Sequence, residues 1–225
     1  RTEIVITSGS SEALDIALRA ILDPGDEVLC ADPCYVAYLP TTQMAGGCFV
    51  PVPTYSANDF RLLPGDIEAR ITPRTKALLL GYPSNPTGAV MGREDLASVG
   101  EVAARHDLAV ISDELYDRMT YSGMHASFPA VPGMRDRTIL LGGFSKAYAM
   151  TGWRLGWVCA PAPLAEAIMK VHQYVMMSAP TAAQYAGVAA LDEGEEFVQA
   201  MVAEFDRRRR LIVDGFRAIG LPTFE

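Results

Sequence analysis

Short apolar runs alternate along most of the chain with longer segments of helical periodicity. The run at Ala77–Gly81 has no polar residue, which is typical of a strand buried on both faces of a parallel sheet. Strands are predicted at Ile4–Ile6, Val28–Ala31, Phe49–Val52, Ala77–Gly81, Leu108–Ile111, Thr138–Leu141 and Leu155–Ala160. Helices are predicted at Ser10–Leu22, Val36–Met44, Pro64–Ile71 and Arg93–His106, and over most of the chain from Pro163 onward. This alternation predicts an α/β fold with a mostly parallel sheet covered by helices on both faces.

Composition excludes several classes of protein. The 225 residues are 50% hydrophobic, which is too apolar for a disordered chain and enough for a sizeable core. A formal net charge of −8 argues against a nucleic-acid-binding function, because neutralising phosphates requires a basic face. The one basic run, Arg207–Arg210, follows Glu204 and Asp206 and is interpreted as the solvated face of a helix.

Two further patterns bear on the compartment. Cysteines occur at Cys30, Cys34, Cys48 and Cys159 without a Cys-x-x-Cys pair, so we expect buried, reduced thiols in a cytoplasmic protein. The stretch Val171–Leu191 carries no charged side chain and is long enough to cross a membrane. Its six scattered polar and proline residues would be penalised in lipid, so two buried helices broken at Pro180 are the preferred interpretation.

In open α/β sheets, ligands bind beyond the carboxyl ends of the strands. The segments that follow the predicted strands are therefore candidates: Ser8–Ser11, Asp32–Tyr35, Pro83–Gly88, Asp113–Tyr116 and Ser145–Lys146. None of the dinucleotide, Walker or nucleophile-elbow glycine motifs occurs in the sequence. The three histidines are not spaced as metal ligands, so no metal site is predicted.

The strand-end residues nevertheless suggest a chemistry. Lys146 follows a predicted strand among small residues, where loss of hydration favours a nucleophilic amine that can form a Schiff base with a carbonyl. Alone, it would be interpreted as an ordinary surface lysine, as Lys76 and Lys170 are. Arg154 lies between small and aromatic residues and suits a phosphate. Ser10 and Ser11 begin a predicted helix, where an anion site or a plain serine cap is expected. Asp113 follows a predicted strand, where its carboxylate can pair with a cationic nitrogen; the alternative is an acid that caps a turn or a helix.

Five motifs in this order resemble those of the fold-type I aminotransferases that use pyridoxal phosphate, of the aspartate-like or N-acetyl-diaminopimelate-like branch. The motifs are Thr7–Leu14, Asp32–Tyr35, Asn85–Gly88 (Asn-Pro-Thr-Gly), Ser112–Tyr116 (Ser-Asp-Glu-Leu-Tyr) and Ser145–Gly156, which contains the lysine and the arginine. The resemblance continues more weakly through Ala179–Leu191. It implies a three-layer αβα sandwich, with pyridoxal 5′-phosphate as the cofactor.

The resemblance also implies roles for individual residues. Lys146 would hold the cofactor as a Schiff base and move protons at the substrate α-carbon. Asp113 would pair with the pyridinium nitrogen, which keeps the ring able to accept electrons. The remaining implied contacts are Asn85 and Tyr116 to the ring hydroxyl oxygen, Tyr35 stacked on the ring, and Ser10, Ser11 and Arg154 to the phosphate. Gly143 replaces a phosphate-binding serine of some relatives, and Ser145 is the candidate substitute.

The implied function is transfer of an amino group between an amino acid and a 2-oxo acid. Residues 1–225 would form the cofactor-binding large domain of a homodimeric enzyme, without the family's N-terminal arm and C-terminal small domain. Two alternatives stay open on the motifs alone. A carbon–sulfur lyase or decarboxylase would use the same cofactor on the same fold. A non-catalytic regulatory domain that senses the cofactor would also retain these motifs.

Overall fold

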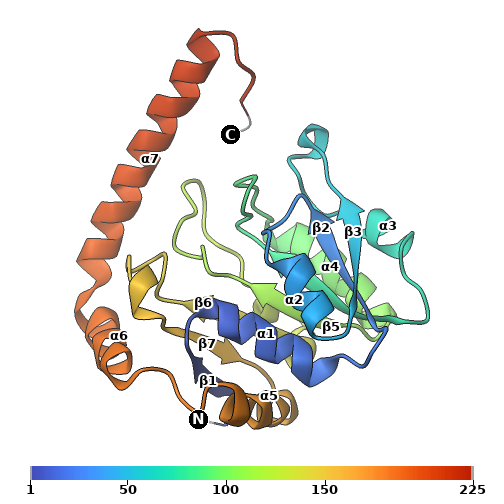
Figure 1. The fold of residues 1–225 in the computed structure, drawn as a ribbon. Helices are drawn as coiled ribbons and strands as arrows, with labels where there is room; N and C mark the ends of the chain where they lie inside the picture. The colour runs from blue at the N-terminus through green and yellow to red at the C-terminus, as the bar shows by residue number, and fades with distance from the viewer. Residues whose placement is uncertain (1, 224–225) are drawn as a thin grey trace.

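Seven strands form one sheet in a computed structural model that describes residues 2–223 (Figure 1). Their order across the sheet is β1-β7-β6-β5-β4-β2-β3. The strands are β1 (Ile4–Thr7), β2 (Glu27–Asp32), β3 (Cys48–Pro53), β4 (Thr75–Gly81), β5 (Ala109–Asp113), β6 (Thr138–Gly143) and β7 (Gly156–Cys159). Each overlaps a strand predicted from the sequence, so the predicted succession of strands is confirmed.

The sheet is mostly parallel, as predicted. β2 pairs in parallel with β3 and β4, and the parallel pairing continues from β4 through β5 to β6. β7 is antiparallel to both of its neighbours, β6 and β1. The carboxyl ends of β2, β4, β5 and β6 therefore lie along the same edge of the sheet, and the segments that follow them lie close together.

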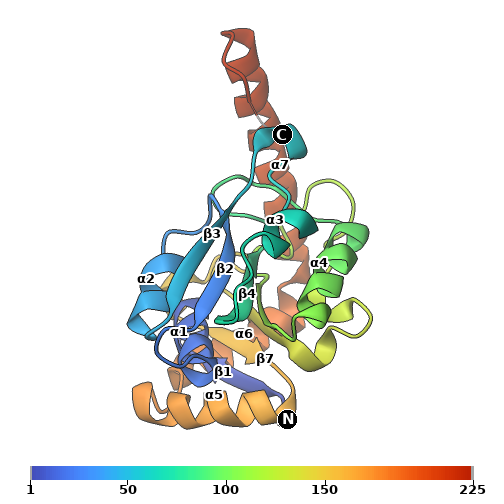
Figure 2. The ribbon, with the colours of Figure 1, turned by 90° about the vertical axis from the view of Figure 1, so that its right-hand side faces the viewer.

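Helices cover both faces of the sheet, and Figure 2 shows α2 and α4 on its opposite sides. One face packs against α1 (Ser10–Ile21), α2 (Tyr38–Met44) and α5 (Ala162–Val175), and the other against α3 (Pro64–Glu68) and α4 (Arg93–Arg105). Because side chains alternate along a strand, β4 contributes Ala77 and Leu79 to the first core and Leu78 and Leu80 to the second. The three-layer αβα sandwich is thus confirmed.

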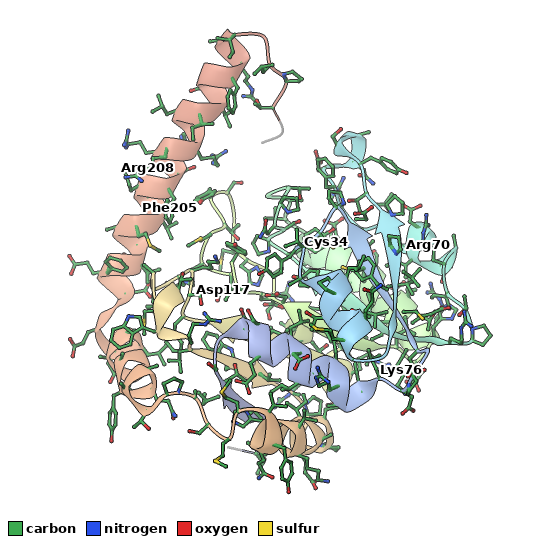
Figure 3. All side chains as sticks on the ribbon, in the orientation of Figure 1. Cys34, Arg70, Lys76, Asp117, Phe205 and Arg208 are labelled. Atoms are coloured by element: carbon green, nitrogen blue, oxygen red, sulfur yellow. The ribbon has the colours of Figure 1, made fainter. Side chains whose placement is uncertain are left out.

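The carboxyl-terminal helices extend the fold beyond these layers. α6 (Thr181–Glu193) packs Ala183 against a small cluster that includes Phe144 and Leu155. α7 (Glu195–Ala218) projects away from the sheet, and Arg208 on it lies far from the layers in Figure 3. Short 3₁₀ segments complete the elements: η1 (Ser56–Asn58), η2 (Phe128–Ala130), η3 (Arg135–Arg137) and η4 (Thr151–Trp153).

The structure corrects three predictions. α2 begins at Tyr38 rather than Val36, because a turn from Tyr35 to Tyr38 precedes it. The helices flanking Pro180 are separate, as predicted, but α6 is not buried, since among its residues only Ala183 and Gly187 are classed as buried. All four cysteines are free, yet Cys30 alone is fully buried and Cys48 is exposed on the edge strand β3.

Two other sequence interpretations concern charge and membranes. The basic run lies on α7, where Arg207, Arg208 and Arg210 are exposed, so its interpretation as the solvated face of a helix is confirmed. Glu204 pairs with Arg207 and Arg208, and Asp206 pairs with Arg209 and Arg210. Within residues 2–223, none of the helices combines the length and the apolar character needed to cross a bilayer.

Candidate functional site

A cleft opens at the carboxyl ends of the central strands. It brings together every residue proposed above as a catalytic or cofactor-binding group: Ser10, Ser11, Tyr35, Asn85, Asp113, Tyr116, Ser145, Lys146 and Arg154. The sequence predicted this convergence because parallel strands present their carboxyl ends at one edge. The individual contacts that the cleft makes possible depend on the geometry described next.

Asp113 is the last residue of β5, and two donors hold its carboxylate. Tyr38 Oη donates to Asp113 Oδ2 at 2.9 Å, and the backbone N–H of Leu115 donates to Oδ1 at 3.2 Å. Burial raises the pKa of the Asp113 carboxyl, while the bonds from Tyr38 and Leu115 lower it by a smaller amount. A half-buried acid that is kept in place by two donors is suited to meet a cationic nitrogen.

Lys146 lies three residues beyond β6, and its ammonium faces the ring of Tyr116, with Nζ 5.6 Å from the ring centroid. Neither of the other lysines shares this environment. Lys76 is exposed at the second position of β4, at the amino end of this strand, whereas the cleft lies at the carboxyl ends. Lys170 on α5 is exposed and paired with Glu166 at 3.0 Å. Lys146 is therefore the one lysine of the chain that lines this cleft.

The amino end of α1 forms the second part of the cleft. The N-cap is Gly9, and no side chain caps the helix. The serines are therefore not caps. They occupy the first two helical positions, where backbone N–H groups lack partners within the helix. Such a helix start attracts anions, through these N–H groups and the helix dipole.

Arg154 completes this anion-binding arrangement. Its φ is +54°, and its Nη1 donates to the carbonyl of Thr151 at 2.9 Å while Nη2 lies 3.5 Å from the carbonyl of Ser8. Gly9, with φ +81°, lets the guanidinium approach, because a Cβ at this position would overlap Arg154. Gly156 has a comparable role from β7, since its Cβ would come within 2.7 Å of the backbone of residues 9 and 10. Gly9 thus makes room for the guanidinium, and Gly156 lets β7 lie close to the start of α1.

The aromatic and amide groups of the cleft come from two loops. Tyr35 follows β2 and contacts Tyr38 edge to face, with the ring centroids 5.6 Å apart. At 37% exposure, Tyr35 leaves its ring accessible to a ligand. Asn85 lies in the loop after β4 and is exposed, and the peptide bond between it and Pro86 is cis.

Sequence reasoning missed Tyr38 as a part of this site, whereas Gly9 lies in the predicted segment Ser8–Ser11. Tyr38 was predicted to lie within a helix, and only the fold shows that its side chain reaches β5. No periodicity signalled this contact, because Tyr35 precedes α2 and the partner of Tyr38 lies 75 residues further along the chain. Among residues 2–223, no group of three or more histidine, cysteine, aspartate or glutamate side chains is arranged to hold a metal ion.

Comparison with known proteins relates this geometry to a family. Residues 1–225 match the family model described as aminotransferase class I and II. A putative aminotransferase of Bacillus subtilis, YugH, is 47% identical over 97% of this chain and 57% of its own length. The aspartate aminotransferase of Pyrococcus abyssi is 42% identical over 98% of this chain and 58% of its own length.

Solved structures agree with the sequence comparison. The aromatic aminotransferase of Pyrococcus horikoshii superposes with a TM-score of 0.95 and 41% identity, over 98% of this chain and 60% of that one. The chain thus spans somewhat more than half the length of these relatives. From its motifs, its fold and these matches, the chain belongs to the class I and II aminotransferases, a family of enzymes that depend on pyridoxal phosphate.

Proposed function

We propose that residues 1–225 form the cofactor-binding large domain of an aminotransferase that moves an amino group between an amino acid and a 2-oxo acid. One observation carries the proposal. Lys146, the Asp113 carboxylate and the Arg154 guanidinium, brought from three separate segments, line the same cleft at the edge of the sheet. An amine, an acid and an anion site are the groups that an aldehyde, a pyridine nitrogen and a phosphate would require.

The residues present fit pyridoxal phosphate. The helix start offers Ser10 and Ser11 next to Arg154, whose guanidinium lies where a Cβ on Gly9 would be. Serine hydroxyls, free N–H groups and a guanidinium are all donors, as a phosphate needs. Ser145 is buried in the wall of the same cleft and supplies a further hydroxyl.

When bound, pyridoxal phosphate supplies an electron-accepting ring that stabilises negative charge at the substrate α-carbon. The chain's own residues would do the rest. The Lys146 amine would hold the aldehyde carbon as a Schiff base, formed with loss of water, until the amino group of the substrate displaces it. The freed amine would then carry the proton between the α-carbon and the cofactor carbon. Asp113 would hold the proton on the pyridine nitrogen, and Tyr38 would hold Asp113 in place. Asn85 and Tyr116 would donate to the ring hydroxyl oxygen, while Tyr35 would cover the ring face.

The proposal names only the classes of the two substrates, an amino acid as the amino donor and a 2-oxo acid as the acceptor. Two of the relatives named above are an aspartate aminotransferase and an aromatic aminotransferase by their names. Carbon–sulfur lyases and decarboxylases use the same cofactor, so the reaction products are the deciding measurement. Incubation with an amino acid and a 2-oxo acid should yield a new amino acid. Release of ammonia, thiol or carbon dioxide instead would contradict transamination.

We further propose that the protein acts as a homodimer in the cytoplasm. Large apolar side chains at the end of α5 and on α6 are exposed, including Tyr174 at 91%, Met177 at 81% and Tyr185 at 76%. Apolar surface of this kind commonly lies in subunit interfaces. Four free cysteines suit a reducing compartment. Light scattering coupled to size-exclusion chromatography tests the dimer, and a monomer at micromolar concentration would contradict it.

Covalent trapping tests the cofactor assignment directly. The chain is incubated with pyridoxal phosphate, reduced with borohydride and digested, and the labelled peptide is identified by mass spectrometry. We expect the label on Lys146. Lys146→Ala should bind cofactor without a trapped label, whereas Lys76→Ala, an exposed lysine far from the cleft, should label as wild type. Label on Lys76 or Lys170, or none on folded protein, would disprove the assignment.

A further inference from the structure

Two buried side chains, Glu12 and His172, contact each other next to the start of α1 and have no role in the function proposed so far. Glu12 is the third residue of α1, and His172 lies on α5, 160 residues away in sequence. His172 Nδ1 lies 2.6 Å from Glu12 Oε1, and both side chains are buried, at 5% and 6% exposure. Because a carboxylate only accepts hydrogen bonds, Nδ1 of His172 carries the proton in this contact.

The second oxygen of Glu12 holds the loop that precedes the helix. The backbone N–H of Ser8 donates to Glu12 Oε2. The carbonyl of Ser8 faces Nη2 of Arg154 at 3.5 Å. The backbone of Ser8 is therefore held on both sides, because Glu12 accepts from its N–H and Arg154 lies next to its carbonyl. Glu12 thus determines where the turn through Gly9 lies, and with it the start of α1.

The charges in this arrangement need explanation. A carboxylate buried one turn from a site for a phosphate would repel the phosphate and would be costly to bury without a partner. His172 supplies that partner from α5, and the Ser8 N–H supplies a second. Both oxygens of the Glu12 carboxylate therefore accept hydrogen bonds from the protein. Glu12 does not belong to the lining of the cleft.

We infer that Glu12 and His172 are positioning residues for the phosphate end of the cofactor. Glu12 holds the Ser8–Gly9 turn in the shape that aims the N–H groups and hydroxyls of Ser10 and Ser11 at a phosphate, and His172 holds Glu12. This inference rests on the proposed binding of pyridoxal phosphate. It differs from a purely structural role, in which the pair would only tie α1 to α5 and contribute to stability.

The test compares two ligands that differ only in the phosphate. Affinity for pyridoxal phosphate and for pyridoxal is measured by absorbance for wild type and for Glu12→Ala, with thermal unfolding recorded in parallel. A hydrogen bond to a charged group contributes more net free energy than one between neutral groups. We therefore expect Glu12→Ala to lose about tenfold in affinity for pyridoxal phosphate. Affinity for pyridoxal should change by less than about twofold. Glu12→Gln, whose amide oxygen can still accept from Ser8, should recover most of the loss.

A matched control separates positioning from stability. Glu27 is another buried carboxylate held by several donors, and it lies at the opposite end of the sheet, at the start of β2. Glu27→Ala should lower the unfolding temperature and leave the ratio of the two affinities unchanged. Should Glu12→Ala fail to fold, His172→Leu allows the same comparison, because it leaves the Glu12 carboxylate with one partner fewer.

The outcomes are distinguishable. A wild-type chain that folds but binds neither ligand would contradict the proposed function itself. A wild type that binds pyridoxal phosphate, combined with Glu12 and His172 variants that keep the wild-type ratio of affinities, would overturn the positioning role alone. Equal losses for pyridoxal phosphate and pyridoxal would also overturn it, since a general loosening of the fold acts on both ligands.

Discussion

Tyr38 Oη donates a hydrogen bond of 2.9 Å to Oδ2 of Asp113, and so joins α2 to the end of β5 inside the cleft. Gly81 on β4 makes the contact possible, because a Cβ there would overlap the Tyr38 hydroxyl. Tyr38 is itself buried, and burial together with the nearby Asp113 charge raises its pKa well above 10, so it stays a donor at neutral pH. The acid proposed to face the cofactor ring is therefore held from behind by a neutral phenol.

Removing the Tyr38 hydroxyl should change the pKa of Asp113 without changing the shape of the cleft. In Tyr38→Phe the carboxylate loses a donor that favours its charged form, so the pKa of Asp113 should rise above its wild-type value. The free energy of unfolding at neutral pH should fall by roughly 1.5–3 kcal/mol, the range for a hydrogen bond to a charged group. Carbon-13 NMR of labelled aspartate measures the first effect, and urea unfolding measures the second. Tyr35→Phe is the control, and equal titration of Asp113 in both variants would contradict the prediction.

Asp113 should cost the cofactor-free protein stability at neutral pH. Its pKa is raised in the folded state by burial, so its contribution to stability is fully present below the ordinary value of 3.8 and is lost as pH rises through the raised pKa. Asp113→Asn keeps the shape and removes the charge. We expect this variant to be more stable than wild type at pH 7 and to lose that advantage below about pH 3.8. Thermal unfolding across this pH range measures it, and a wild type that is the more stable at pH 7 would refute it.

In the holoenzyme, Asp113→Asn should have the opposite consequence for catalysis. Without the carboxylate the pyridine nitrogen loses the partner that keeps it protonated, so the half-reaction with an amino-acid donor should slow by at least about a hundredfold, roughly 3 kcal/mol in the barrier. Cofactor affinity should fall much less, because the phosphate contacts are unchanged. Stopped-flow absorbance gives the rate. A rate within a few-fold of wild type would leave Asp113 only a structural role.

Arg154 should contribute more to cofactor affinity than Ser10. A charge-assisted bond is about twice as strong as a neutral one, and a neutral bond contributes about 1 kcal/mol net. Arg154→Ala should therefore weaken binding of pyridoxal phosphate by roughly 30-fold and Ser10→Ala by roughly fivefold. Both affinities are measured at one salt concentration. Arg135→Ala, an exposed arginine paired with Glu3, serves as the control. Equal losses for Arg154→Ala and Ser10→Ala would show that Arg154 does not reach the phosphate.

Two glycines with positive φ, Gly9 and Gly25, separate backbone strain from steric overlap. Gly9 and Gly25 have φ of +81° and +91°, but a Cβ at Gly25 meets no atom within 4 Å, whereas one at Gly9 overlaps Arg154. Each substitution by alanine should lower the free energy of unfolding by about 1–3 kcal/mol, because an L side chain is strained at positive φ. Only Gly9→Ala should also weaken binding of pyridoxal phosphate, because it displaces the guanidinium. Loss of binding in Gly25→Ala would indicate a general defect in folding.

Much of the fold and of the site followed from local pattern. The apolar run of β4 indicated a strand buried on both faces, and the alternation with helices indicated a parallel sheet. Since parallel strands end at one edge, the residues after them, among them Asp113 and Lys146, were predicted to meet, and they line one cleft.

Long-range packing decided the rest. Periodicity in sequence describes one element at a time, so it carries no information on the order of strands, on the antiparallel placement of β7, or on which helix covers which face. The contact of Tyr38 with Asp113 spans 75 residues and that of Glu12 with His172 spans 160. Each exists because two elements distant in sequence bury polar side chains against one another, and buried polar groups must find partners wherever the fold places them. The residues that line the cleft are thus recognisable from local sequence motifs, whereas the contacts that hold them in place depend on tertiary packing.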